Sequence, residues 1–494
     1  MVDHLSRRSF LTGAAAAFLA PGAVSANAPE RSLYPQARPD GLNGPERVIR
    51  SAGLRGDVAF AVADAQTGLG LEAFGGDSTL PPASVAKALT ALYALDVLGV
   101  DHRFATRVLA AGPVEGGILK GDLILAGGGD PLLDTRHLAG LAARVKQAGI
   151  HEVQGAFKVY DGALPFVKSI DPGQPDHVGY SPAVSGIALN FNRVHFEWKR
   201  AGSGYAVSMD APAGDYRPAV AMAKMQVARR SLPIYTYESG PRLDSWTVAS
   251  GALGNGGARW LPVRLPGLYA GDVFQTLMRA HGIALSRVEV VRDLPQGTTE
   301  LARHESEPMR DILRGMLKYS TNITAEMVGM SATAARAGIP ASLEASAQEM
   351  NAWAVERFGM QSPAMVDHSG LGPASRLAPQ DLVRALVAMH GDGTLRSLMK
   401  PFLMRDASGR VMTTHPIKVD AKTGTLNFVS GLGGYMTAAD GTQLAFAIFT
   451  ADLETRAKIP RAQRERPDGA RSWNRRAKGL QQALIERWGA LYGS

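Results

Sequence analysis

Hydrophobic and polar residues follow one another in patterns that predict both strands and helices. Residues 57–64 are an apolar run between two aspartates, and a glycine-containing turn leads to a second short run that ends near Phe74. Both runs are typical of strands. Prolines 81 and 82 then interrupt the chain. From Ser84 onward apolar residues recur at helical spacing, which predicts a buried helix that begins at Ser84.

The C-terminal half shows helical patterns first and strand patterns later. Helices are expected from about 308 to 319 and from about 325 to 335. The runs 432–437 and 444–449, joined by Asp440-Gly441, predict a β-hairpin. A terminal helix with Leu480, Leu484, Ile485 and Trp488 on one side is expected to pack on that hairpin sheet. The alternative is an anchor on a membrane surface, for which the apolar stripe is narrow.

The long interval between these regions is rich in short strand-like runs punctuated by turn residues. We therefore expect a catalytic domain formed by 27–97 and 266–494 and split by a mostly β insertion, 98–265. Asp122, Asp130 and Asp134 within the insertion fit turn and cap roles better than a cation site, because their spacing is not that of a calcium loop.

The first residues resemble an export signal. Arg7-Arg8 lies in a twin-arginine string, an apolar stretch follows, and Val24-Ser25-Ala26 offers a cleavage site. Residues 1–26 are therefore interpreted as a twin-arginine signal peptide, and the mature protein is expected in the periplasm.

Composition narrows the possible chemistry. The chain has 494 residues, no cysteine and a formal net charge of +8. Zero cysteine excludes thiol catalysis and cysteine-based metal sites. Acidic residues interleave with the basic ones and no nucleic-acid motif is present, so we expect no DNA or RNA partner. We also expect no cofactor, no metal and at most loose membrane association.

Three short strings carry the candidate chemistry: Ser84-Val-Ala-Lys87, Ser320-Thr-Asn322 and Lys422-Thr-Gly424. Each is common by chance. Their order and their expected structural context are less common by chance. The first string lies at a helix start, the second on a turn between helices and the third on a strand. Such a set is typical of β-lactamases and penicillin-binding proteins.

These residues suit an acyl transfer on a substrate that carries a carboxylate. Lys87 can accept the proton of Ser84 only when it is neutral, and burial together with the charge of Lys422 would lower its pKa. Lys422 would stay charged for the carboxylate. Ser320 can relay a proton to the leaving amine, Asn322 can orient Lys87, and the backbone N–H groups of Ser84 and Thr425 are candidates for the oxyanion hole.

The chain resembles the low-molecular-mass class C penicillin-binding proteins, the D-Ala-D-Ala carboxypeptidase/endopeptidases. Besides the three motifs, residues 121–131 and 181–192 resemble segments of that family. The resemblance implies a transpeptidase-like α/β (α+β) domain, an antiparallel sheet flanked by helices, split by an insertion that forms two smaller domains. It also implies a Ser84 nucleophile and substrate contacts from Thr423, Gly424, Thr425, Asp161 and Arg376.

The implied substrates are peptidoglycan stem peptides, with β-lactam antibiotics as covalent inhibitors. The segment 367–376 departs from the family pattern, since Pro373 and Ser375 replace an arginine and an asparagine. Two other functions stay open: a serine β-lactamase, for which Glu356 lacks the expected motif context, and a catalytically weak scaffold that binds the cell wall.

Overall fold

The computed structural model describes residues 44–406 and 408–493. The expected signal peptide, 1–26, lies outside this range. Among the described residues no helix is both long and apolar enough to cross a membrane.

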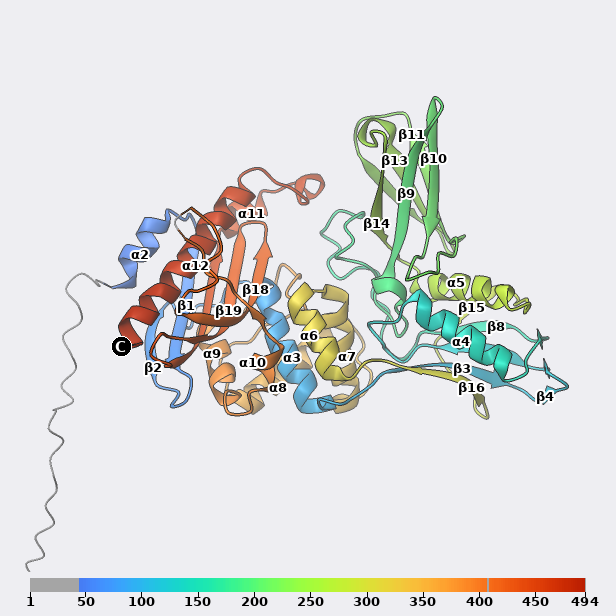
Figure 1. Cartoon of the computed structure of the whole chain (residues 1–494), viewed down its shortest axis with the longest axis horizontal. Coiled ribbons are helices and arrows are strands. Elements are labelled where there is room, and N and C mark those ends of the chain that lie inside the picture. The colour runs from blue at the N-terminus through green and yellow to red at the C-terminus, as the bar shows by residue number, and fades with distance from the viewer. Residues whose placement is uncertain (1–43, 407, 494) are drawn as a thin grey trace, which may run out of the picture. The chain divides into compact units, whose positions relative to one another are not determined.

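A six-stranded antiparallel sheet carries the C-terminal hairpin and the first strand of the chain side by side (Figure 1). Its order is β17-β18-β19-β20-β1-β2, and β1 pairs with β20 along its whole length. The strands are β1 Asp57–Asp64, β2 Gly70–Phe74, β17 Lys400–Pro401, β18 Lys418–Leu426, β19 Val429–Thr437 and β20 Gln443–Ala451. The predicted first strands and the hairpin around Asp440-Gly441 are confirmed.

Helices cover both faces of this sheet, which explains why its central strands are apolar on both sides. Phe60 of β1 packs toward Leu484 and Trp488, whereas its neighbour Ala59 packs into the core on the opposite face. The predicted packing of the terminal helix on the sheet is confirmed. One face is covered by α2 Pro45–Ala52 and α12 Ala470–Tyr492. On the other face α9 Pro379–Ala388 packs on β1, β19 and β20. The core on that face continues through α3 Ala86–Leu98, on which α6 Met309–Tyr319, α7 Asn322–Ala337, α8 Leu343–Phe358 and α10 Thr394–Leu398 pack.

The insertion is built on a five-stranded sheet, on which two helices pack (Figure 1). The helices are α4 Thr135–Gln147 and α5 Pro266–Ala280, and the strands in order are β15 Val288–Val291, β8 Phe157–Tyr160, β6 Asp122–Ala126, β3 Ala105–Ala111 and β16 Thr299–Glu305. Asp134 caps α4 by accepting from the N–H groups of Arg136 and His137, the cap role expected for it.

This sheet extends beyond residue 265, where the sequence placed the end of the insertion. Glu305 still pairs with Ala105, so strand pairing favours an end near residue 306. The sequence did not indicate this later end because β15 and β16 are short, mostly exposed and show no clear alternation of apolar and polar residues. The helix α4 is likewise an α element within an interval expected to be mostly β.

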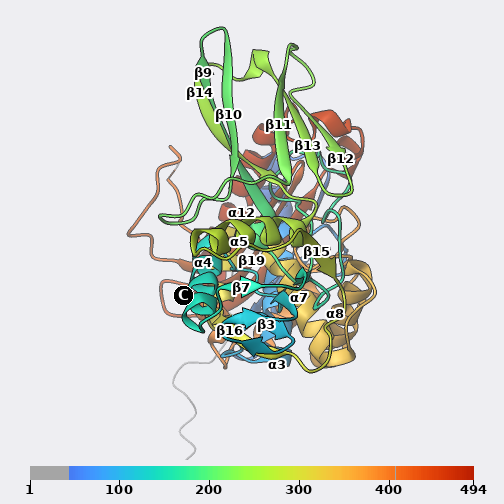
Figure 2. The same cartoon turned by 90° about the vertical axis from the view of Figure 1, so that its right-hand side faces the viewer.

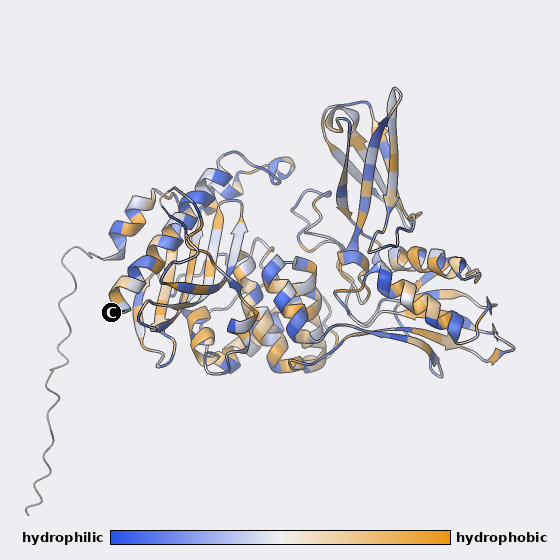
Figure 3. Ribbon diagram, in the orientation of Figure 1, coloured by the Kyte–Doolittle hydropathy of each residue, from blue (hydrophilic) through white to orange (hydrophobic). Residues whose placement is uncertain are grey.

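Two three-stranded sheets complete most of the insertion and lie side by side (Figure 2). Hydrophobic and hydrophilic residues alternate along β9, as expected for a sheet with one face on a core (Figure 3). The first sheet holds β10 Gly204–Asp210, β9 Arg193–Ala201 and β14 Gly256–Pro262; the second holds β11 Ala223–Ala228, β13 Asp244–Ala249 and β12 Tyr235–Ser239. A small third sheet holds β4 Val114–Glu115, β5 Ile118–Leu119 and β7 Glu152–Val153.

Candidate active site

Ser84 and Lys87 lie one helical turn apart and are hydrogen bonded. Ser84 sits in a 3-10 turn, Ala83–Val85, that leads directly into α3. The Lys87 ammonium donates to Ser84 Oγ at 3.0 Å and is fully buried. Ala83 has a positive φ of 48°, a conformation that non-glycine residues seldom adopt and that is concentrated at functional sites.

Two further acceptors surround the Lys87 ammonium. Asn322 Oδ1 and the carbonyl oxygen of Ser369 each lie 2.8 Å from Lys87 Nζ. With Ser84 Oγ they provide one acceptor for each of the three N–H groups. Asn322 is the first residue of α7, so the start of that helix positions its amide.

Ser320 and Lys422 form a second serine–lysine pair. Ser320 ends α6 in the left-handed conformation, with φ 58°, on the predicted turn between the two helices. Lys422 Nζ donates to Ser320 Oγ at 3.0 Å and to the carbonyl of Thr423 at 2.6 Å. The side chain of Lys422 is buried, and Lys422 lies within β18, on a strand as predicted.

Gly424 allows β18 to approach the turn that carries Ser84. A Cβ at Gly424 would lie 2.7 Å from the carbonyl oxygen of Pro82 and 2.9 Å from the Ser84 nitrogen. Both distances are too short for a side chain. The next residue, Thr425, lines the same cleft as Ser84.

That cleft has a volume of about 350 Å³ and combines catalytic-domain and insertion residues. Ser84, Ser320, Asn322 and Thr425 share it with Gln174 and Tyr180. The carbonyl of Tyr180 accepts from Asn322 Nδ2 at 2.9 Å. The insertion therefore contacts the amide that also binds Lys87.

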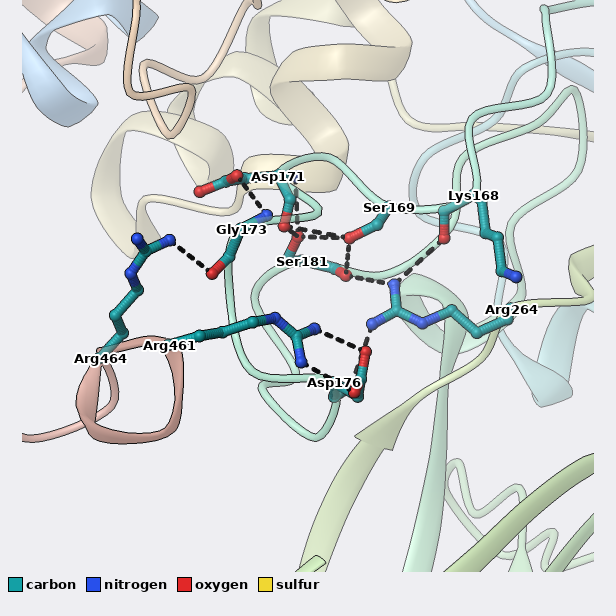
Figure 4. Close-up of polar contacts among 9 residues, drawn as sticks. All are labelled: Lys168, Ser169, Asp171, Gly173, Asp176, Ser181, Arg264, Arg461 and Arg464. Atoms are coloured by element: carbon teal, nitrogen blue, oxygen red, sulfur yellow. Dashed lines mark hydrogen bonds and ion pairs between the residues drawn. The ribbon is translucent and has the colours of Figure 1, made fainter. Parts of the chain in front are cut away.

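The segment 168–182, which we call the insertion loop, is tied to residues 461–465 (Figure 4). Arg461 binds both carboxylate oxygens of Asp176 at 2.8 and 3.2 Å, and Arg464 donates to the carbonyl of Gly173 at 2.7 Å. Beside the residues drawn there, Glu465 accepts from His177 and Arg259. These partners hold the pKa of Glu465 down at about 2. The loop is fixed as one wall of the cleft.

Both lysines have lowered pKa values. Burial lowers the pKa of Lys87 to about 8, although Glu326 and Asp367 counteract it. Burial, then the charges of Lys87 and Lys400, lower the pKa of Lys422 to about 7. The sequence assigned the neutral form to Lys87 and the charged form to Lys422; in the free protein Lys422 is the more acidic of the two.

Two buried acids that the sequence patterns did not reveal support Lys87. Glu326 accepts from the backbone N–H groups of His368 and Ser369 at 2.8 and 3.1 Å, and Asp367 accepts from Gly370 and Gly372. Glu326 lies four residues after Asn322 on α7, and that spacing on a buried helix was the available signal. Glu356, in contrast, is exposed and paired with Arg336.

Asp161 and Arg376 are not among the described residues that line the cleft of Ser84. Asp161 is buried in the insertion, with Arg292 Nε 3.2 Å away, and burial raises the pKa of its carboxyl. Arg376 donates to the carbonyls of Pro373 and Ser375 at 2.8 and 2.9 Å. The structure therefore does not bring these two side chains into the cleft of Ser84.

An antiparallel sheet flanked by helices, with two serine–lysine pairs at its edge, defines the class of serine acyl-transfer enzymes that includes penicillin-binding proteins. Residues 47–471 match the D-Ala-D-Ala carboxypeptidase 3 (S13) family, and the chain belongs to this family of serine D-Ala-D-Ala carboxypeptidases.

Similar proteins agree with this assignment. A D-alanyl-D-alanine carboxypeptidase of Actinomadura is 28% identical over 82% of this chain and 79% of its own length. The carboxypeptidase DacB of Haemophilus influenzae is 26% identical over 80% of this chain and 86% of its own. The crystal structure of penicillin-binding protein 4 from the same organism covers 90% of this chain and 99% of its own, with 20% identity and a TM-score of 0.71. It shows the same fold, including the β-rich insertion. Another structure of that protein contains a β-lactam.

Proposed function

We propose that Ser84 is the nucleophile of a DD-peptidase that removes terminal D-Ala from peptidoglycan stem peptides, cuts D-Ala–diaminopimelate cross-links, or does both. The observation that carries the assignment is the 3.0 Å hydrogen bond between Ser84 Oγ and the buried ammonium of Lys87. A lysine with a lowered pKa, held at hydrogen-bond distance, is placed to act as the base of a serine nucleophile.

Acylation follows from these contacts. Neutral Lys87 takes the Ser84 hydroxyl proton as Oγ attacks the carbonyl carbon of the penultimate D-Ala. The backbone N–H groups of Ser84 and Thr425 stabilise the oxyanion. As the C–N bond breaks, Ser320 gives its proton to the leaving amine and is reprotonated from Lys422, to which it is bonded. The proton that Lys87 took from Ser84 restores the charge of Lys422, so both lysines regain their starting states. Water then attacks the Ser84 ester, gives one proton to Ser84 Oγ and leaves its hydroxyl on the released, shortened peptide.

Other residues recognise the substrate in this scheme. Thr423 and Thr425, with charged Lys422, receive the carboxylate that follows the scissile bond, and Gly424 keeps the strand close enough to Ser84 for them to do so. Asp161 and Arg376 would act further from the bond that is cut, on the side chain of the stem peptide. Penicillins would acylate Ser84 as substrate mimics.

Labelling with a fluorescent penicillin tests the proposal. The purified protein should form a stable covalent adduct and release D-Ala from a pentapeptide, and Ser84→Ala should do neither. Ser78→Ala is the matched control. Ser78 is an exposed serine shortly before Ser84 in the chain, so its replacement should leave both labelling and D-Ala release unchanged. An unlabelled parent protein would overturn the Ser84 assignment. Rapid release of the label would favour a β-lactamase, and stable labelling without peptide cleavage would favour a scaffold.

We further propose that the protein works in the periplasm after twin-arginine export, as Arg7-Arg8 and the apolar stretch after them indicate. The substrate lies in that compartment. Replacing both arginines with lysine should leave the precursor inside the cell, as fractionation and immunoblotting would detect; unchanged export would contradict the route.

A further inference from the structure

A second, larger pocket adjoins the active-site cleft. It has a volume of about 710 Å³, and its lining includes Ser320, Lys422 and Thr423. Ser320 also lines the cleft of Ser84, so the two spaces meet at this serine. The pocket is flanked by β17 and by the helix α12. We call it the basic pocket, for the reason that follows.

Cations predominate on the walls of the basic pocket. Besides Lys422, five basic side chains line it, from four different parts of the chain: Lys318, Lys400, Arg405, Arg475 and Lys478. The acids of the lining are Asp406 and Glu486. Asp406 is already paired with Arg410 at 3.0 Å. All five cations are exposed at the surface.

These five cations lack acidic partners in the part of the protein that the structure describes. Among the described residues, none of the five forms an ion pair with a carboxylate; Arg405 donates to the carbonyl of Gly409, and Lys318 lies over the ring of Tyr319. Lys400 lies near enough to Lys422 to lower the pKa of that lysine. Unpaired cations around one concave surface raise the local concentration of anions.

The proposed chemistry fixes which part of a substrate would enter this pocket. Thr425 lines the cleft of Ser84, whereas Lys422 and Thr423, earlier on the same strand, line the basic pocket. A substrate whose scissile carbonyl lies between Ser84 and Thr425, and whose carboxylate lies near Lys422, runs along β18 toward the basic pocket. The group that leaves as an amine therefore enters it, while the acyl part stays in the smaller cleft.

We propose that the basic pocket binds an anionic peptide leaving group, so that cross-linked peptides are preferred over substrates that release free D-Ala. This inference rests on the proposed function. Free D-Ala carries one carboxylate, which Lys422 and the threonines satisfy. In a leaving stem peptide the carboxylate of the diaminopimelate residue takes that place, and the further carboxylates along the stem would contact the exposed lysines and arginines.

Two double variants on α12 test the proposal. Arg475→Gln/Lys478→Gln removes two charges from the pocket, and Arg471→Gln/Arg476→Gln removes two exposed charges from the same helix outside it. For each, kcat/KM is measured on a purified cross-linked muropeptide dimer and on a pentapeptide. Because exposed ion pairs are individually weak, we expect the pocket variant to cleave the dimer with a kcat/KM that is roughly tenfold lower than that of the parent protein. The pentapeptide value should change less than about twofold.

The remaining outcomes separate this inference from the proposed function. The control variant should retain both activities, and salt should reduce the advantage of the dimer in the parent protein. Equal losses on both substrates, or no loss on the dimer, would overturn the role of the pocket while leaving the Ser84 chemistry intact. A parent protein that is acylated by penicillin and releases D-Ala but does not cleave the dimer would overturn it too. If the proposed function itself is wrong, penicillin will not acylate the parent protein.

Discussion

Glu326 and Lys87 are joined through the backbone of a single residue. The carboxylate of Glu326 accepts from the N–H of Ser369 at 3.1 Å, and the carbonyl of Ser369 accepts from Lys87 at 2.8 Å. Both side chains are fully buried. Burial raises the pKa of Glu326 and lowers that of Lys87, so it disfavours the charge on each of them.

Glu326→Gln should alter the titration of Lys87 as well as stability. The Glu326 charge raises the pKa of Lys87, so its removal should lower that pKa and move the acid limb of the acylation profile to lower pH. The amide of Gln also has a single accepting oxygen for the two N–H groups, and leaving one of them unpaired should lower the free energy of unfolding by about 1–3 kcal/mol. Acylation rates against pH and a thermal melt measure the two effects. Glu356→Gln, on the surface, is the control; an unmoved acid limb would contradict the coupling.

The acylation rate should have a bell-shaped dependence on pH. The active state needs Lys87 neutral and Lys422 charged, although the pKa of Lys87, about 8, lies above that of Lys422, about 7. Raising the pH therefore discharges Lys422 before it frees Lys87, so the active state is always a minority of the protein and its population is greatest midway between the two pKa values, at about pH 7.5. Stopped-flow labelling by a penicillin between about pH 5.5 and 9.5 would show it. A rate that only falls from pH 6 upward would exclude Lys87 as the base.

Glu465→Gln should loosen the insertion loop. The folded-state pKa of Glu465, about 2, lies below its ordinary value, so its stabilising contribution is present above that ordinary value and is lost as the pH falls toward 2. Hydrogen exchange of residues 173–180 should accelerate severalfold in the variant at neutral pH, and in the parent only under acid conditions. Glu454→Gln, in the exposed pair with Arg55, is the control. Unchanged exchange would show that the loop is held by other contacts.

Gly370→Ala should disrupt the active site. A Cβ there would lie 1.9 Å from the carbonyl oxygen of Ala83, beside the nucleophile, and the φ of 73° is itself unfavourable for alanine. We expect the free energy of unfolding to fall by at least about 3 kcal/mol and penicillin to label little of the protein. Gly391→Ala meets no atom within 4 Å and has no left-handed φ, so it should behave as the parent does. A Gly370→Ala protein with normal melting and labelling would contradict the close approach of these two loops.

Local sequence signals were enough to predict much of the fold and the two serine–lysine pairs. The hairpin around Asp440-Gly441, the strand 57–64 and the helical spacing of Ser84 and Lys87 each depend on neighbours in sequence. Glu465 and Tyr180 could not be found in this way, because their roles depend on the insertion loop meeting the C-terminal segment across more than 280 residues. The missed strand β16 is similar: its pairing with β3, not its composition, makes it a strand.

The pairing of β1 with β20 also sets a condition on biosynthesis. On the ribosome, β1 is made early and must wait for the last strand of the sheet, which is complete only at Ala451. The sheet that brings Gly424 against the turn of Ser84 can therefore close only after Ala451 has been translated. Nascent or prematurely ended chains carry the nucleophile but no assembled site, so the activity appears only at the end of synthesis.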